Sequence, residues 1–236
     1  MKRLALFARR PVPGQVKTRL IPALTARLAC RLHLAMLADA IAVLEAAAAD
    51  ERWLYWADGS LDAAAGAADA ALVLPFGVRE GVQSGADLGE RLQRAFSELL
   101  AGGSQAVVFG SDCPWLRAGH IEQAFGALEH ADLVVGPASD GGYTLIGLRS
   151  PRPELFAGIE WGTSRVLEQT LARAAEGGLE VEKLETLDDL DTAEDLVRAI
   201  QRITSQRIAA GDAARSRHRN LILALEAFAL LPHAQR

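Results

Sequence analysis

The chain has 236 residues, half of them hydrophobic, and a formal net charge of −5 at pH 7. This length suits one large α/β domain or two small ones and supplies ample material for a buried core. The negative charge argues against general nucleic-acid binding, which needs a broad basic surface. Two cysteines, Cys30 and Cys113, are too few for a disulfide framework or a metal cluster.

No stretch of the sequence approaches the ~20 apolar residues of a membrane span. The apolar run that follows Lys2 and Arg3 is too short for a secretory signal and ends in two arginines. We therefore expect a cytoplasmic protein with no membrane partner.

The first predicted element is a strand at residues 4–8, followed by a stiff, basic loop. Pro11 and Pro13 fix their own φ angles, and Gly14 lets the backbone turn where a Cβ would obstruct it. A strand, a stiff loop and a helix in this order often bind phosphates in α/β proteins. A plain solvated loop is the alternative. The basic side chains of this loop are Arg9, Arg10, Lys17 and Arg19.

Charge is unevenly distributed along the chain. Residues 1–38 contain eight basic side chains and no acid, a local charge of +8. Only three of the 25 basic residues are lysines, namely Lys2, Lys17 and Lys183. A lysine inside the basic loop of a chain that prefers arginine indicates that a compact ammonium is wanted there.

Helical spacing of apolar residues predicts a helix over residues 25–49, with Thr25 as its N-cap and His33 as a structural side chain. The next expected elements are a strand at 52–57, a short helix to about 70, a third strand at 72–74, and a helix that follows the loop 83–91 and ends near 100.

The apolar residues 105–109 predict a buried parallel strand with Asp112 just beyond its end. Asp140-Gly141-Gly142 between two β-rich runs indicates a hairpin. The alternation of strands and helices predicts a mostly parallel sheet wrapped by helices. The remaining expected elements are helices at 118–130, from 165 to about 176, from 192 to about 203 and at 221–231, and strands at 132–135, 143–148 and 179–184.

Acidic side chains form the second half of a candidate site. A carboxylate at a strand end, such as Asp112, suits a hard cation like Mg²⁺, although it could instead cap the next helix. The segment 180–195 holds eight acids and one lysine, and Asp191 within it could likewise be a helix cap. Facing a basic loop, these acids make sense as the metal side of a polyphosphate site.

Several common nucleotide and hydrolase motifs are absent. A P-loop would need glycine at positions 11 and 16, where this chain has Pro11 and Val16. No Gly-x-Gly-x-x-Gly follows a strand, and neither a Ser-His-Asp nor a Cys-His arrangement can be assigned.

Five ordered motifs nevertheless carry a family resemblance: residues 7–20, 110–114, 136–143, 161–164 and 189–196. Over residues 1–203 they resemble the transferase family associated with radical-SAM and selenium-domain genes, in the nucleotide-diphospho-sugar transferase superfamily. The chain is more distantly similar to 2-phospholactate and molybdenum-cofactor guanylyltransferases. It departs from the family at Arg9, where lysine is common, and at Ala193, where proline is common.

The resemblance implies a three-layer α/β/α, GT-A-like domain at 1–203, with a mostly parallel sheet and one antiparallel hairpin, and a helical tail at 204–236. It implies Mg²⁺ or Mn²⁺ held by Asp112 and Asp191, and catalysis by Lys17, Arg19 and Asp112. The nucleotide would be bound by Arg10, Gly14, Lys17, Thr18, Arg19 and Gln83. The acceptor would be bound by Asp140, Gly141, Gly142, Tyr143, Trp161, Thr163 and Ser164.

Three functions are consistent with these motifs. The first is a nucleotidyltransferase that joins a nucleoside triphosphate to a small phosphorylated or acidic acceptor and releases pyrophosphate. The second is a glycosyltransferase that uses a nucleotide sugar, although such enzymes often carry Asp-x-Asp where this chain has Asp112-Cys113-Pro114. The third is a non-catalytic nucleotide-binding module. The apolar tail is expected to pack on the domain or on a second subunit as a homodimer contact.

Overall fold

The computed structural model describes residues 1–57, 72, 74–210 and 218–231, so the short helix expected near residue 70 lies outside the described part. The elements in chain order are β1 (Lys2–Ala8), η1 (Thr18–Leu20), α1 (Ala26–Ala46), β2 (Glu51–Trp56), β3 (Val78–Val82), α2 (Leu88–Leu99), β4 (Gln105–Gly110), α3 (Ala118–Ala127), β5 (Leu133–Pro137), β6 (Tyr143–Leu148), η2 (Pro153–Phe156), α4 (Val166–Glu176), β7 (Val181–Lys183), α5 (Ala193–Ala210) and α6 (Arg219–Ala227).

The strands form one seven-stranded sheet in the order β3-β2-β1-β4-β6-β5-β7. β6 is antiparallel to both of its neighbours, β4 and β5, while every other neighbouring pair in this sheet is parallel. The predicted parallel sheet with one antiparallel hairpin is therefore confirmed. Because β1 and β4 are adjacent and parallel, the loops that follow their carboxyl ends emerge at the same end of the sheet.

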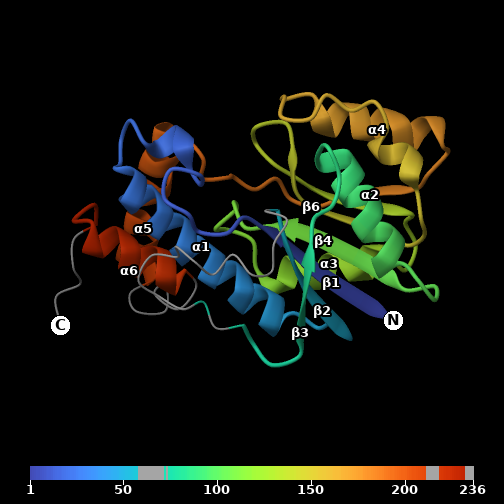
Figure 1. The fold of residues 1–236 in the computed structure, drawn as a ribbon, viewed down its shortest axis with the longest axis horizontal. Coiled ribbons are helices and arrows are strands. Elements are labelled where there is room, and N and C mark those ends of the chain that lie inside the picture. The colour runs from blue at the N-terminus through green and yellow to red at the C-terminus, as the bar shows by residue number, and fades with distance from the viewer. Residues whose placement is uncertain (58–71, 73, 211–217, 232–236) are drawn as a thin grey trace.

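Side chains that alternate along each strand enter two separate cores. In β1, Leu4 and Leu6 face the core that α1, α3, α5 and α6 cover, whereas Ala5 and Phe7 face the core beneath α2 and α4. Figure 1 shows α1, α5 and α6 on one side of the sheet and α2 and α4 on the other. The result is a three-layer α/β/α arrangement with both faces of the sheet buried.

Three expected elements have clearly different bounds in the structure, and one of them is the tail helix α6, which spans Arg219–Ala227 rather than 221–231. The third strand is β3 at Val78–Val82, whereas Leu72 and Leu74 are not in a strand. β3 lies at the sheet edge and reads Val-Arg-Glu-Gly-Val, so it lacks the apolar run that signals a buried strand. The α5 helix continues to Ala210 rather than ending near 203, because no glycine or proline interrupts the sequence over that interval.

The tail contributes to the first core. Leu221, Ile222 and Leu225 on α6 are buried in the same cluster as the α1 side chains. The α6 helix therefore packs on α1 of its own chain. Within the described residues, no helix has the length and apolar character needed to cross a bilayer.

Candidate functional site

The basic loop is anchored by apolar side chains on either side of its lysine. Gly14 has φ +81°, and the N–H of Gln15 donates to the carbonyl of Val12 at 3.0 Å, which makes the predicted turn. Val16 and Leu20 are buried, so the segment between them is held against the core. Lys17 lies between these anchors in the left-handed conformation, at φ 48° and ψ 40°, which costs a non-glycine residue about 1–2 kcal/mol. The loop therefore fixes where the Lys17 side chain enters the molecule.

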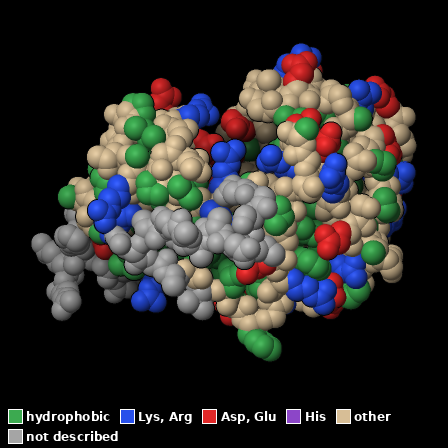
Figure 2. All heavy atoms as spheres, viewed as in Figure 1, with side chains coloured by type: hydrophobic (Ala, Val, Ile, Leu, Met, Phe, Trp, Pro, Cys, Tyr) green, Lys and Arg blue, Asp and Glu red, His purple; other side chains and the backbone are tan. Residues whose placement is uncertain are grey.

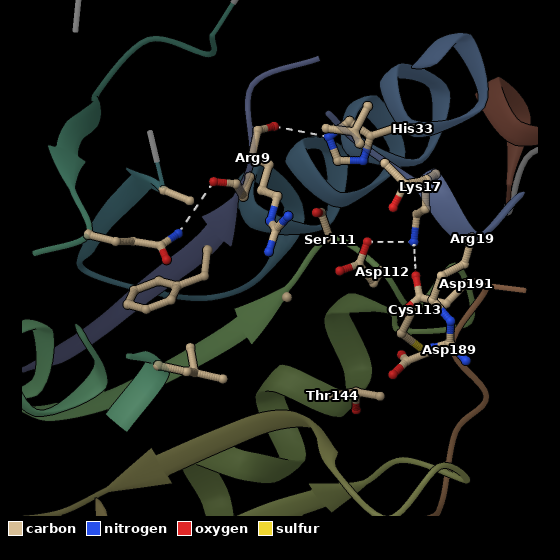
Figure 3. Close-up of a pocket in the computed structure, with 18 of the residues that line it drawn as sticks. Arg9, Lys17, Arg19, His33, Ser111, Asp112, Cys113, Thr144, Asp189 and Asp191 are labelled. Atoms are coloured by element: carbon tan, nitrogen blue, oxygen red, sulfur yellow. Dashed lines mark hydrogen bonds and ion pairs between the residues drawn. The ribbon is translucent and has the colours of Figure 1, made fainter. Parts of the chain in front are cut away.

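The Lys17 ammonium lies between two carboxylates. Its Nζ is 2.6 Å from Oδ1 of Asp112 and 2.6 Å from Oδ1 of Asp191 (Figure 3). The lysine side chain is only 2% exposed, while the two carboxylates keep 52% and 38% of their surface exposed. Both acids thus remain accessible from the cleft, although they share one buried cation.

The position of Asp191 is set by the start of α5. The Thr192 N–H donates to Oδ2 of Asp195 at 2.7 Å, and the Asp195 N–H donates back to Thr192 Oγ1 at 3.3 Å. This is a reciprocal capping box. The alternative in which Asp191 caps the helix was therefore wrong, and its carboxylate is left for Lys17.

The position of Asp112 is set by two loops. The N-cap of α3 is Arg117, whose backbone N–H donates to Nδ1 of His120 at 3.0 Å, so Asp112 is not the cap of that helix. The Asp112 carbonyl accepts the N–H of Leu190 at 3.0 Å, which ties the end of β4 to the acidic segment before α5. This backbone hydrogen bond brings Asp112 and Asp191 together at the carboxyl end of β4.

The carboxylate pair opens into a cleft of about 470 Å³. Figure 2 shows basic and acidic side chains meeting in a hollow between the α1, α5, α6 side and the α2, α4 side. Of the predicted site residues, those that line the cleft are Lys17, Thr18, Arg19, Gln83, Asp112, Tyr143 and Asp191. The predicted basic and acidic halves therefore share one cavity.

Six further polar side chains line this cleft and are not among the predicted site residues: Arg9, His33, Arg91, Ser111, Thr144 and Asp189. Arg9, Ser111 and Asp189 lie inside or beside the sequence motifs, so proximity could have suggested them. His33, Arg91 and Thr144 come from α1, α2 and β6, and no local pattern marks them because the sheet order brings them together.

The cleft shifts the pKa values of titratable side chains that line it. Burial alone would lower the pKa of the Lys17 ammonium, but the charges of Asp112 and Asp191 outweigh it and raise that pKa. Burial, followed by the negative charges of Asp112, Asp140 and Asp191, raises the pKa of Asp189 to about 7. A cleft with closely spaced acids therefore favours a bound cation.

His33 is structural, as the sequence suggested, although it also lines the cleft. Its Nε2 lies 3.0 Å from the carbonyl oxygen of Arg9, so this nitrogen must carry the proton and donate. Burial lowers the pKa of His33 and so favours the neutral ring. The hydrogen bond holds the start of the basic loop against α1.

Gln83 has a similar bracing role. Its side-chain amide donates to the carbonyl of Tyr55 at 2.9 Å and to that of Ala8 at 3.3 Å.

Arg10, which the sequence predicted as a nucleotide contact, lies outside the main cleft. Its guanidinium carbon lies over the Trp56 ring, 4.5 Å from the ring centroid. It lines a neighbouring hollow of about 200 Å³ together with Arg9 and Arg91.

The predicted acceptor residues separate into two groups. Tyr143 lines the cleft, whereas the other predicted acceptor residues do not line it, namely Asp140, Gly141, Gly142, Trp161, Thr163 and Ser164. The turn at Gly141 packs against the 161–164 segment so closely that a Cβ at Gly141 would lie 2.0 Å from the carbonyl oxygen of Ser164. The two motifs are thus side by side, with the glycine allowing backbone contact between them.

The donor set suits a divalent metal of the Mg²⁺ type. Asp112 and Asp191 aim one oxygen each at a single point that already takes a cation, the Lys17 ammonium. Mg²⁺ prefers oxygen ligands, keeps several waters and often uses only one or two carboxylates. Among the described residues no cluster of three or more His, Cys, Asp or Glu side chains could hold a metal. Asp112 and Asp191 are the residues here that could hold such an ion, with waters as further ligands.

Comparison with known proteins identifies relatives. The family described as "Uncharacterized protein conserved in bacteria (DUF2064)" matches residues 33–163, more than half of the chain. A crystal structure from Desulfovibrio desulfuricans G20, described as a nucleotide-diphospho-sugar transferase, has a TM-score of 0.78 and 30% sequence identity, over 96% of this chain and 95% of that one. No curated protein matches the sequence.

More distant structures share the fold. A cytidylyltransferase from Leptospira borgpetersenii has a TM-score of 0.55 and 13% identity, over 100% of this chain and 98% of that one. Rv0371c from Mycobacterium tuberculosis H37Rv, crystallised as a complex with manganese, has a TM-score of 0.51 and 15% identity, over 85% of this chain and 99% of that one. The GT-A-like fold expected from the sequence is thereby confirmed.

Proposed function

The chain belongs to the bacterial protein family DUF2064, and we propose that this member is a metal-dependent nucleotidyltransferase. It joins a nucleoside triphosphate to a small phosphorylated or acidic acceptor and releases pyrophosphate. The relative from Desulfovibrio desulfuricans G20 is described as a transferase, and this chain is a transferase as well.

One observation carries the proposal. The basic loop and the acidic segment are far apart in the sequence, but they meet at the ion pairs of Lys17 with Asp112 and Asp191 in one cleft. Arg9, Arg19 and Arg91 line the same cleft and add positive charge beside the carboxylates. A triphosphate with a bound metal needs both kinds of charge within a few ångströms of each other.

In the proposed reaction an anionic oxygen of the acceptor attacks the α-phosphorus. The new O–P bond forms as the bond from the α-phosphorus to the bridging oxygen breaks, and pyrophosphate leaves with that electron pair. A bound Mg²⁺ or Mn²⁺ would neutralise charge on the phosphates, held by Asp112 and Asp191. An anionic acceptor needs no general base.

The basic side chains orient the leaving group. Lys17 and Arg19 contact the β- and γ-phosphates and stabilise the negative charge that develops on pyrophosphate. Thr18 and Gly14 shape the loop around the phosphates, and Arg10 lies where the basic surface continues into the second hollow. The acceptor lies toward Tyr143 and the turn at Asp140–Gly142, on the β6 side of the cleft.

A screen of ligands tests the reaction class. Thermal shift with Mg²⁺ against the four nucleoside triphosphates and a panel of nucleotide sugars should give stabilisation by at least one triphosphate. A pyrophosphate-release assay with small phosphorylated and carboxylate acceptors should then give turnover. Stabilisation by nucleotide sugars alone, with sugar transfer and no pyrophosphate from any triphosphate, would contradict the proposal.

The second candidate is sugar transfer from a nucleotide sugar. The description of the relative from Desulfovibrio desulfuricans G20 as a nucleotide-diphospho-sugar transferase favours it. The single acid of Asp112-Cys113-Pro114 and the strongly basic loop favour nucleotidyl transfer instead. A non-catalytic module would bind nucleotide without turnover.

Within the family, we further propose that the chain belongs with the radical-SAM and selenium-domain-associated transferases. Its five sequence motifs support this assignment.

A further inference from the structure

We propose that Lys17 is a resident cation that the divalent metal displaces: in the nucleotide-free protein its ammonium holds the metal position between Asp112 and Asp191, and on metal and nucleotide binding it moves to the phosphates. The inference rests on the proposed function, because it assigns two successive partners to one side chain of that site. It makes metal binding and nucleotide binding dependent on each other.

The geometry places the two cations in competition for the same two carboxylate oxygens. Both Oδ1 atoms lie 2.6 Å from the same Nζ, so the carboxylates converge on one point. Mg²⁺ prefers oxygen ligands, and a metal held by these two Oδ1 atoms would need the place that the ammonium occupies. A metal on both Oδ1 atoms and an ammonium on the same two atoms cannot be present together. Either Lys17 leaves, or the metal binds elsewhere.

The loop allows the side chain to move while the backbone stays. Val16 and Leu20 are buried on either side of Lys17, and the left-handed turn at Lys17 fixes the direction of its side chain. The lysine stem has four rotatable carbons and a compact head, so its ammonium can change partners without moving the loop. Arginine, with a planar fork, could not make this exchange as readily. This gives a reason for lysine here in a chain with only three lysines.

The exchange needs an anion to receive the ammonium. The Lys17 side chain is 2% exposed, and a buried charge without a partner is costly. Metal alone would leave it unpaired, whereas a bound nucleotide offers phosphate oxygens beside Arg9 and Arg19 in the same cleft. Metal should therefore bind weakly to the free protein and strongly to the nucleotide complex.

Mn²⁺ binding to the protein without nucleotide tests the exchange directly, by electron paramagnetic resonance or calorimetry. Lys17→Met removes the competing cation, and we expect it to bind Mn²⁺ about tenfold or more tightly than wild type, the equivalent of one charge-assisted hydrogen bond. The matched control is Arg19→Met, which removes one positive charge from the same cleft but no described ion pair with either acid. It should change the affinity much less. Equal affinity in Lys17→Met and wild type, or equal gains in both variants, would overturn the proposal.

A measurement on the wild-type protein keeps the proposal testable should Lys17→Met not fold. Selective ¹³C labelling of lysine gives side-chain signals from three residues only, and Lys2→Arg and Lys183→Arg identify the Lys17 signal by elimination. Mg²⁺ with a non-hydrolysable nucleoside triphosphate should move that signal. A Lys17 signal unmoved by a metal and nucleotide that calorimetry shows to bind would overturn the exchange.

The proposed function can fail separately. If no nucleoside triphosphate binds or releases pyrophosphate, nucleotidyl transfer is wrong. The comparison of Mn²⁺ affinity between Lys17→Met and Arg19→Met uses neither nucleotide nor acceptor, so it still decides whether Lys17 occupies the metal position.

Discussion

Asp39, within α1, accepts the backbone N–H of Leu221 on Oδ2 at 3.0 Å and the N–H of Asn220 on Oδ1 at 3.1 Å. A carboxylate of one helix thus caps the N-terminus of another. Because α6 is a short helix, this cap and the burial of Leu221 and Leu225 help to attach the tail to the domain.

Asp39→Ala should lower the free energy of unfolding by about 1–2 kcal/mol, the usual cost of losing an N-cap. Chemical denaturation measures this loss, and Glu45→Ala, which changes an exposed acid on the same helix, is the control.

The proposed domain boundary at residue 204 falls within α5. A chain truncated after Thr204 should be less stable and less soluble, because the truncation removes the helix that covers α1. An unchanged melting temperature in both the variant and the truncated chain would contradict a packed tail.

Gly141→Ala should destabilise the protein strongly, by more than about 2 kcal/mol. Gly141 has φ +91°, and an added Cβ would lie 2.0 Å from the backbone oxygen of Ser164, so the penalty combines backbone strain with a clash that backbone cannot relieve. Gly178→Ala is the control, since it has φ +61° with nothing within 4 Å of the new Cβ. The control should show the strain alone, and an equal loss in both variants would argue against close contact between the two turns.

As the pH rises from about 4 to about 7, the stability of the folded protein should fall because of Asp189. Its pKa is raised from 3.8 to about 7 in the folded protein, so in this interval the folded state binds more protons than the unfolded state. The free energy of unfolding therefore decreases as the pH rises. Unfolding curves at several pH values with EDTA measure the slope, which Asp189→Asn should flatten while the exposed control Glu194→Gln leaves it in place. A slope that persists in Asp189→Asn would assign it to other groups.

Asp112→Asn and Asp191→Asn should each weaken metal-dependent nucleotide binding by about tenfold or more, because each removes one anionic ligand of the proposed metal. Calorimetry with Mg²⁺ and nucleotide, repeated in EDTA, separates the metal-dependent part. Glu122→Gln, an exposed acid on α3, is the control. Metal-dependent binding that is unchanged in both variants would rule out this pair as the metal site.

Lys17→Ala and Arg19→Ala should each weaken the binding of a nucleoside triphosphate in the presence of Mg²⁺. The loss of a charge-assisted hydrogen bond typically costs roughly 1.5–3 kcal/mol, or about tenfold or more in affinity. Arg149→Ala is the control, because Arg149 pairs with Asp132 at the opposite edge of the sheet. A diphosphate should be affected less than a triphosphate, and equal losses for both would favour a site built for nucleotide sugars.

Local sequence signals were enough to predict the elements that carry the site. The apolar run before the basic loop, the turn at Gly14 and the N-cap at Thr25 each depend on a few neighbouring residues, and each appears as expected. The edge strand β3 was misplaced because Arg79 and Glu80 interrupt its apolar residues, and edge strands do not need an apolar run. The end of α5 was misplaced because no breaker residue marks it.

The relation between the basic and acidic halves could not be read from the sequence. Lys17 lies 95 positions from Asp112 and 174 from Asp191, so their contact depends on the order of the strands and on the backbone bond between Leu190 and Asp112. The sequence suggested separate places for the lysine and the metal on opposite sides of the phosphates. In the folded protein the ammonium lies between the two acids, where its charge offsets the repulsion between the carboxylates.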